Sequence, residues 1–153
     1  MKEIERKFLI KEMPSLEGVS SSVIKQGFII KNDKGLLRVR TLINGDKKIG
    51  FITVKESGLL VRNEYEMEIP YDVAESFLFN CENLINKTRY YIPNGETTIE
   101  LDVFSGKLSG LLLAEIEMKD ENQQIEIPSW FGKEVTEDPN YTNIKLAFLG
   151  IPK

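Results

Sequence analysis

The sequence predicts a mainly β fold with peripheral helices (α+β), in which antiparallel strands close into a β-barrel around a charged tunnel. Charged side chains stand at every second position along six or seven segments, and alternate side chains of a strand point to the same face. These charges come in blocks of one sign rather than in mixed order. Short turn motifs join the segments, which favours antiparallel hairpins.

Composition limits the classes of function. The 153 residues are 41% hydrophobic and 29% charged, which suits a single domain over residues 1–153. A net charge of −4 provides no basic field for nucleic acid or an anionic membrane, so neither is expected as a partner. There is no histidine and one cysteine, Cys81, which excludes a Ser-His-Asp triad, histidine-ligated metals and an intrachain disulfide. No apolar run reaches the length of a membrane span and the N-terminus is charged, so we expect a cytoplasmic protein.

The opening segment, residues 1–10, contains the pattern from which the other strands are interpreted. Written as a strand, it places Glu3, Glu5 and Lys7 on one face. Carboxylates are ligands for hard cations such as Mg2+, and lysine binds phosphate, so this face suits a metal beside an anion. Taken alone, the segment favours a solvated edge strand with mixed charges over a metal site. The same charge pattern returns along the chain, however.

Residues 11–70 are predicted to form a loop followed by four strands. The loop covers residues 11–26, and short hairpin signals such as Asn44-Gly45 separate the strands. The strands are predicted at residues 27–30, 36–43, 48–55 and 60–70. Side chains that share one face of these strands are Arg38 and Arg40, then Thr53 and Lys55, then Arg62, Glu64, Glu66 and Glu68.

The rest of the chain is predicted to contain two helices and three more strands. Asp72 can cap a helix over residues 73–80, and Thr142 or Asn143 can cap a last helix through Leu149. Strands are predicted at residues 87–92, 98–104 and 111–118, which align Lys87 with Arg89, Glu100 with Asp102, and Glu115 with Glu117. Residues 128–132 are predicted to form a turn or short helix that anchors the C-terminal segment through Trp130, and residues 134–136 a short extended piece.

The order of the charges predicts the tunnel. Like charges two residues apart on a strand repel, and they do so more strongly where the dielectric is low. Blocks of one sign are tolerable if metal ions and a polyanion lie between them. Closing the sheet brings one face of every strand to a common axis and removes exposed edges. The apolar outer face would then be covered by helices at 72–80 and 141–149 and by the loop at 11–26.

On these residues the chain resembles the CYTH superfamily, the triphosphate tunnel metalloenzymes. Glu3-Ile4-Glu5-Arg6-Lys7 is similar to the family's ExExK signature. The likeness continues in order at residues 37–40, 53–55, 62–66, 87–89, 100–104, 114–117 and 134–143. The resemblance implies a closed antiparallel barrel of about eight strands and a substrate that is a triphosphate bound with Mg2+ or Mn2+.

Roles follow from the resemblance and from the chemistry of the side chains. The expected phosphate ligands are basic: Lys7, Arg38, Arg40, Lys55, Arg62, Lys87 and Arg89. The expected metal ligands are acidic: Glu3, Glu5, Asp102, Glu115 and Glu117. Direct catalytic roles are expected for Glu5, Lys55, Lys87 and Glu117. Supporting roles are expected for Glu64, Glu66 and Glu100. Lys145, on the last helix, is expected to be solvated.

The expected reaction is hydrolysis of inorganic tripolyphosphate to pyrophosphate and phosphate by metal-activated water. The family also contains class IV adenylyl cyclases, but this histidine-free chain lacks their His-Phe pair. An isoelectric point of about 5.1 argues against an RNA substrate. Hydrolysis of thiamine or nucleoside triphosphates, a non-catalytic polyphosphate or nucleotide sensor, and a sandwich with solvated charged faces stay as alternatives. A homodimer is compatible with the sequence.

Overall fold

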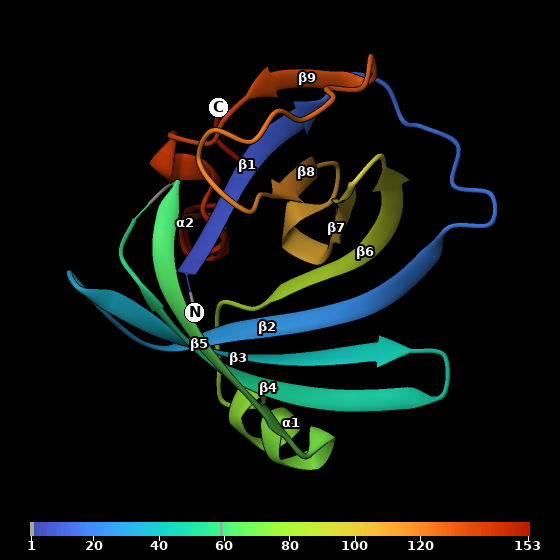
Figure 1. The fold of residues 1–153 in the computed structure, drawn as a ribbon. Coiled ribbons are helices and arrows are strands. Elements are labelled where there is room, and N and C mark those ends of the chain that lie inside the picture. The colour runs from blue at the N-terminus through green and yellow to red at the C-terminus, as the bar shows by residue number, and fades with distance from the viewer. Residues whose placement is uncertain (1, 59) are drawn as a thin grey trace.

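Eight strands form a closed antiparallel barrel in the computed structural model, which describes residues 2–58 and 60–153 (Figure 1). Round the barrel the order is β5-β4-β3-β2-β6-β7-β8-β1, and pairing of β1 with β5 closes it. The strands are β1 (Lys2–Ile10), β2 (Ser20–Asn32), β3 (Gly35–Asn44), β4 (Lys47–Glu56), β5 (Val61–Ile69), β6 (Ile85–Asn94), β7 (Thr97–Ser105) and β8 (Leu112–Glu117). A ninth strand, β9 (Phe131–Glu134), pairs with β1. The predicted fold class is confirmed.

The closing contact between β1 and β5 sets which side chains face inward. Glu3 pairs with Arg62 there, and on the other edge of β1 Glu5 pairs with Glu117 and Lys7 with Glu115. Paired residues point to the same face of a sheet, so the acidic and basic positions of the three strands gather on one side. The opposite face of β1 carries Ile4, Arg6 and Phe8.

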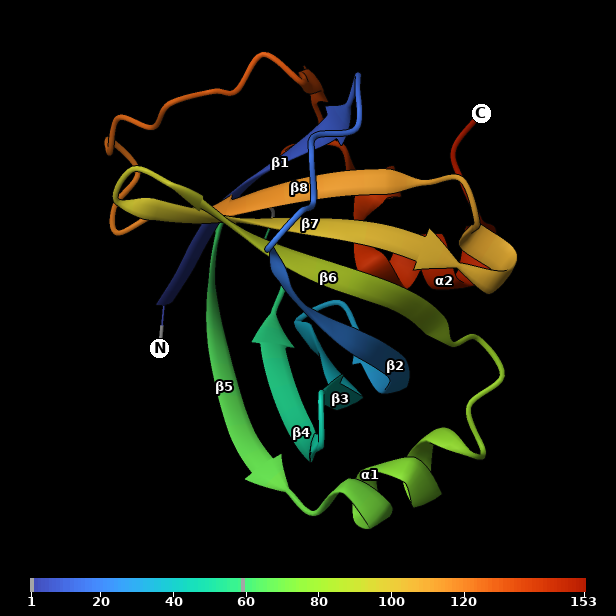
Figure 2. The same cartoon turned by 90° about the vertical axis from the view of Figure 1, so that its right-hand side faces the viewer.

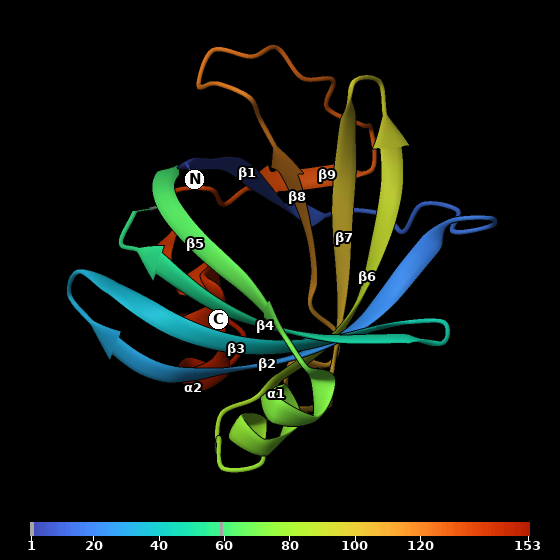
Figure 3. The same cartoon turned by 60° about the horizontal axis from the view of Figure 1, so that its bottom comes forward.

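The apolar residues pack in three groups, two outside the barrel and one at an end of its interior. Helix α1 (Tyr71–Leu78) buries Ala74 and Leu78 against β3 and β4, below them in Figure 3. Helix α2 (Asn143–Leu149) lies behind β6 and β7 in Figure 2 and packs Leu146 and Ala147 against Ile85, Phe104 and Leu113. These three residues share the inner face of the barrel with Lys87 and Asp102, so the prediction that this helix covers the outer face is wrong. The interior of the barrel is therefore apolar at the end that α2 occupies and charged beyond it.

The segment after β8 covers the remaining apolar side. Phe131 is buried against Phe8, with ring centroids 4.8 Å apart, and Trp130 packs edge-on against Phe131. This confirms the predicted anchor. The short 3-10 helices η1 (Gly106–Leu108) and η2 (Pro139–Tyr141) complete the elements. No helix among residues 2–58 and 60–153 is long and apolar enough to cross a membrane.

Three local predictions are wrong. The predicted loop at 11–26 ends at Val19, because β2 begins at Ser20 and finds hydrogen-bonding partners on both sides, in β3 and β6. Such tertiary pairing overrides the turn signal of three successive serines. Pro70, not Asp72, stands at the N-cap of α1 and makes no side-chain cap. The short strand near the C-terminus begins at Phe131, three residues before the predicted extended piece.

The cap of the last helix is confirmed at one of its two predicted positions. The Thr142 side chain accepts a hydrogen bond from the Lys145 backbone N–H, as an N-cap residue does.

Candidate active site

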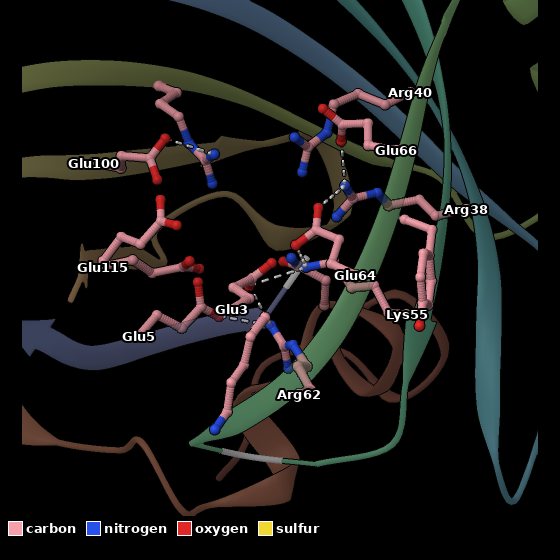
Figure 4. A pocket seen from close by; sticks show the side chains of 15 residues that line it. Glu3, Glu5, Arg38, Arg40, Lys55, Arg62, Glu64, Glu66, Glu100 and Glu115 are labelled. Atoms are coloured by element: carbon pink, nitrogen blue, oxygen red, sulfur yellow. Dashed lines mark hydrogen bonds and ion pairs between the residues drawn. The ribbon is translucent and has the colours of Figure 1, made fainter. Parts of the chain in front are cut away.

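A charged cavity of about 560 Å3 lies inside the barrel and is called the main cavity below (Figure 4). Side chains from seven of the eight barrel strands and from the start of α2 line it. The lining residues are Lys2, Glu3, Glu5, Arg38, Arg40, Lys55, Arg62, Glu64, Tyr65, Glu66, Arg89, Glu100, Glu115, Glu117 and Asn143. Six are basic and seven are acidic, so the cavity is close to neutral overall despite its high charge density.

Carboxylates crowd together on the wall formed by β1 and β8. Glu5 is the centre of a group that we call the Glu5 cluster, which consists of Glu3, Glu5, Glu115 and Arg62. Burial, with Glu115 and Glu3 close by, raises the pKa of Glu5 to about 8. Hydrogen bonding with Glu5 in turn helps to lower the pKa values of Glu3 and Glu115. Three acids therefore share fewer than three negative charges near neutral pH.

Arg62 partly offsets this crowding. Its Nη2 donates to Glu5 Oε1 at 2.7 Å and to Glu3 Oε1 at 3.1 Å. Among the described residues it is the only cation that forms an ion pair with Glu5. Lys55 Nζ lies 3.4 Å from Glu3 Oε1. Burial opposes ionisation of Glu3, but Lys55 and Arg62 outweigh it and lower the pKa of this carboxyl.

A second charged group, the Asp102 cluster, consists of Lys87, Arg89 and Asp102 and is almost completely buried. Asp102 Oδ2 accepts from Lys87 Nζ at 2.7 Å and from Arg89 Nη2 at 2.9 Å, and Oδ1 accepts from Arg89 Nε at 2.7 Å. Burial opposes ionisation of Asp102, but Arg89 and Lys87 outweigh it and lower its pKa. The remaining Arg89 nitrogen, Nη1, donates to Glu100 at 3.0 Å. Asp102 thus fixes the orientation of a guanidinium that lines the main cavity.

Arg38 and Arg40 are held by polar residues of the neighbouring strands. Arg38 Nη2 donates to Thr53 Oγ1 at 3.2 Å and lies 3.6 Å from Glu66 Oε2. Arg40 Nε donates to Gln26 Oε1 at 3.0 Å. Gln26 is fully buried, and sequence reasoning missed it because it lies in the segment predicted as a loop. The sequence does contain an indication of this position: in a strand, Gln26 shares a face with the apolar Ile24 two residues earlier.

Lys55, which lines the main cavity, and Lys7, which does not, differ in their surroundings. Burial, together with the nearby guanidinium groups of Arg38 and Arg62, lowers the pKa of Lys55 to about 7. Lys7 lies toward the C-terminal segment, where its Nζ donates to the Tyr141 carbonyl at 2.9 Å and is 3.8 Å from Glu115. Lys7 is thus bound to the segment that precedes α2.

The structure brings most of the sequence-predicted residues together. All of them line the main cavity except Lys7, Lys87 and Asp102. Asp102, a predicted metal ligand, lies behind Arg89 with both oxygens engaged by cations, and Lys87, a predicted phosphate ligand, lies beside it. Glu117, at the exposed end of β8, does reach the cavity, and burial beside Glu3 and Glu100 raises its pKa.

The acids of this cavity have the chemistry of a divalent-cation site but are not yet arranged as one. Carboxylate oxygens are the preferred ligands of hard cations, and burial with Glu115 and Glu3 close by raises the pKa of Glu5 to about 8, so a bound cation would favour its ionised form. In the part of the chain that the structure describes, no three such ligands converge on one point. A cation bound here would compete with Arg62, whose Nη2 contacts Oε1 of both Glu5 and Glu3.

Comparison with known proteins gives consistent results. The CYTH domain family matches residues 1–145. An inorganic triphosphatase of Acetivibrio thermocellus is 39% identical over 149 residues, which cover 95% of this chain and 93% of that protein. An inorganic triphosphatase of Nitrosomonas europaea is 41% identical over 158 residues, covering 99% and 100%. A crystal structure of an inorganic triphosphatase superposes with a TM-score of 0.69 at 37% identity, covering 99% of this chain and 97% of the other.

Proposed function

The chain belongs to the CYTH domain family, and from this premise we propose that it hydrolyses inorganic tripolyphosphate to pyrophosphate and phosphate with a divalent cation, Mg2+ or Mn2+. One observation carries the proposal: cations and clustered carboxylates line the same cavity. A polyphosphate needs the cations, and a hard metal ion needs the carboxylates. The two relatives named inorganic triphosphatase support this choice among triphosphates.

Binding of the phosphate chain is assigned to the arginines of the main cavity. Arg38, Arg40 and Arg89 come from β3 and β6, and their guanidinium groups are held by Thr53, Gln26 and Asp102. Arginine binds phosphate oxygens in a fixed bidentate geometry, so side chains oriented in advance lose little entropy on binding. Lys55, with a pKa of about 7, contributes a positive charge that phosphate oxygens would strengthen.

The cation would be held by Glu3, Glu5 and Glu115, and Glu117, also predicted as a ligand, is left to act on the water. When bound, a divalent cation neutralises charge on the phosphoryl oxygens and orients the attacking water. Asp102 is left out of this set, because Lys87 and Arg89 already occupy its oxygens. Release of Glu5 frees the Arg62 guanidinium, which can then contact phosphate.

The hydrolytic step needs no covalent enzyme intermediate. A water oxygen forms a bond to a terminal phosphorus, the bond from that phosphorus to the bridging oxygen breaks, and pyrophosphate leaves. We assign Glu117 to accept the proton of the water, because its pKa is raised by burial and by Glu3 and Glu100, and a raised pKa makes a carboxylate a better base. Asp102 acts only through Arg89 and Lys87.

Phosphate release with tripolyphosphate, ATP and thiamine triphosphate side by side tests the proposal. We expect tripolyphosphate to be hydrolysed fastest with Mg2+ or Mn2+ and none of the three to be hydrolysed in EDTA. If tripolyphosphate is inert with both metals, the assignment is wrong. Tight calorimetric binding of tripolyphosphate without phosphate release would instead support a sensor.

A further inference from the structure

A second cavity, of about 210 Å3, lies beside the main one, at the end of the barrel where the β2–β3 hairpin and the start of the β4–β5 connection approach α2. We call it the hairpin cavity. Its wall includes Lys31 and Asn32 from the hairpin, Ser57 and Gly58 from the connection, and Lys145 from α2. Lys145 was expected to be solvated, yet it lines this cavity and is partly buried.

The hairpin cavity adjoins the main cavity through shared side chains. Arg38, Lys55 and Arg62 line both cavities, as does Asn143 at the start of α2. The three basic side chains that line both cavities come from β3, β4 and β5. A chain of phosphates that contacts them in the main cavity therefore has the hairpin cavity directly beyond them.

The two cavities differ sharply in charge. The main cavity has seven acids to six bases. The hairpin cavity has a single acid, Glu56, and six bases: Lys7, Lys31, Arg38, Lys55, Arg62 and Lys145. Glu56 is already engaged, because its Oε2 accepts from Asn63 at 3.0 Å. The hairpin cavity has too few carboxylates to hold a divalent cation. An oxyanion in it would be surrounded mainly by basic side chains.

Four of these bases, Lys7, Arg38, Lys55 and Arg62, form ion pairs with carboxylates of the main cavity, which leaves the exposed Lys31 and the half-buried Lys145. Over residues 2–58 and 60–153, no carboxylate forms an ion pair with Lys31 or Lys145. Arg38 is only 3% exposed, and its Nε has no hydrogen-bond acceptor, nor has the buried Nε of Arg62. Buried donors of this kind are normally satisfied, so their presence indicates an absent acceptor.

We propose that the hairpin cavity is a metal-independent phosphate subsite that continues the main cavity. Its ligand is a phosphate oxyanion bound by Lys31, Lys145 and the shared cations. Two sources supply this chemistry: the outer phosphoryl group of a linear chain longer than three, or pyrophosphate released from the main cavity. The second source rests on the proposed hydrolysis, whereas binding of phosphate oxyanions does not.

Calorimetric titration of pyrophosphate into the chain in EDTA tests the subsite without any turnover. Three bases line the hairpin cavity and not the main one, and the double variant Lys31→Ala with Lys145→Ala removes two of them. The third, Lys7, is left in place because its Nζ is already bound to the Tyr141 carbonyl. We expect its Kd for pyrophosphate to rise about tenfold, the equivalent of 1.4 kcal/mol. The matched control, Lys47→Ala with Lys133→Ala, removes the same charge from exposed positions outside both cavities and should leave the Kd within twofold.

Kinetics then separate the two sources. A rise in KM for tetraphosphate but not for tripolyphosphate in the Lys31/Lys145 variant assigns the subsite to the outer group of a longer chain. A weaker inhibition by pyrophosphate, with both KM values unchanged, assigns it to the product. Equal pyrophosphate affinity for the wild type and both double variants in EDTA would overturn the subsite, even if tripolyphosphate is hydrolysed. Loss of hydrolysis alone would overturn only the proposed function.

Discussion

The Asp102 cluster and the Glu5 cluster lie in the same barrel with opposite balances of charge. In the Asp102 cluster two cations surround one carboxylate and fill its acceptor positions. In the Glu5 cluster three carboxylates share Arg62, and the pKa of Glu5 is raised to about 8 by burial and by its acidic neighbours. The first cluster holds an arginine in place, and the second is where a cation would bind under the proposed function.

The largest effect on stability is expected from Asp102→Asn. This change removes a charge from a buried ion-pair network and leaves Lys87 and Arg89 without their counter-charge, which costs roughly 3–5 kcal/mol. Urea denaturation of the metal-free chain measures the loss. A variant that keeps wild-type stability but loses affinity for Mn2+ would show instead that Asp102 is a metal ligand and that the two clusters do not differ in this way.

Glu5→Gln should lower activity strongly and stability little, the reverse of the stability effect expected for Asp102→Asn. It removes a proposed metal ligand, so we expect phosphate release from tripolyphosphate to fall roughly 100-fold or more. With a pKa of about 8, Glu5 is largely protonated near neutral pH, and Gln resembles that neutral form, so the free energy of unfolding at pH 7 should be unchanged.

The matched control for Glu5→Gln is Glu134→Gln. Glu134 pairs with Arg6 at the exposed side of the neighbouring strand β9, so its loss removes the same charge without touching the cavity. Equal activity of the two variants would contradict a special role for Glu5.

Ligand binding should stabilise the native chain, because a bound cation would add positive charge beside the three carboxylates of the Glu5 cluster. Tripolyphosphate with Mg2+ at 100 times its Kd adds about 2.7 kcal/mol, which differential scanning calorimetry detects as a rise in Tm. The rise should be much smaller in Glu5→Gln than in Glu134→Gln. Equal rises in Tm in both variants would show that the ligand does not bind at the Glu5 cluster.

The pH dependence of stability in EDTA distinguishes the two clusters further. The pKa of Glu5 is about 8 in the folded chain against an ordinary 4.5, so the folded state binds the extra proton and stability is lost as pH rises from about 4.5 to 8. The pKa of Lys55 is about 7 against an ordinary 10.5, so from pH 7 upward this lysine makes stability rise with pH. We therefore expect a minimum of Tm near pH 7–8.

Glu5→Gln should flatten the descending part of this profile between pH 5 and 7 and leave the rise above pH 8, to which the lowered pKa of Lys87 also contributes. Thermal melts of both proteins across pH 5–10 make the measurement. Parallel curves would show that Glu5 does not titrate in this range.

The smallest effect is expected outside the barrel. Arg6 lies next to Glu5 in β1 but points outward, where its Nε and Nη2 donate to Glu134 at 2.9 and 2.6 Å. Exposed ion pairs contribute about 0–1 kcal/mol, so Arg6→Ala should change the free energy of unfolding by no more than that and leave phosphate release unchanged. A large loss of activity in Arg6→Ala would show that contacts on the outer face of β1 affect the position of the cavity residues on its inner face.

The barrel and most of the cavity follow from the amino-acid sequence. Alternation at period two fixes which side chains share a face, and the blocks of charge require an interior that is shared by several strands. This is why Glu3, Glu5, Arg38, Arg40 and Glu115 could be placed together from the charge pattern alone. The same logic failed at residues 20–26, where Gln26 is buried in a strand that the preceding serines do not predict.

The pairing of the charges depends on the tertiary structure. Asp102 and Glu5 look alike in sequence, since each is an acid on the inner face of a strand. Their roles differ because β6 places Lys87 and Arg89 beside Asp102, whereas β8 places Glu115 near Glu5. Coulomb interactions depend on distances across strands, and these are set by register and closure rather than by spacing along the chain.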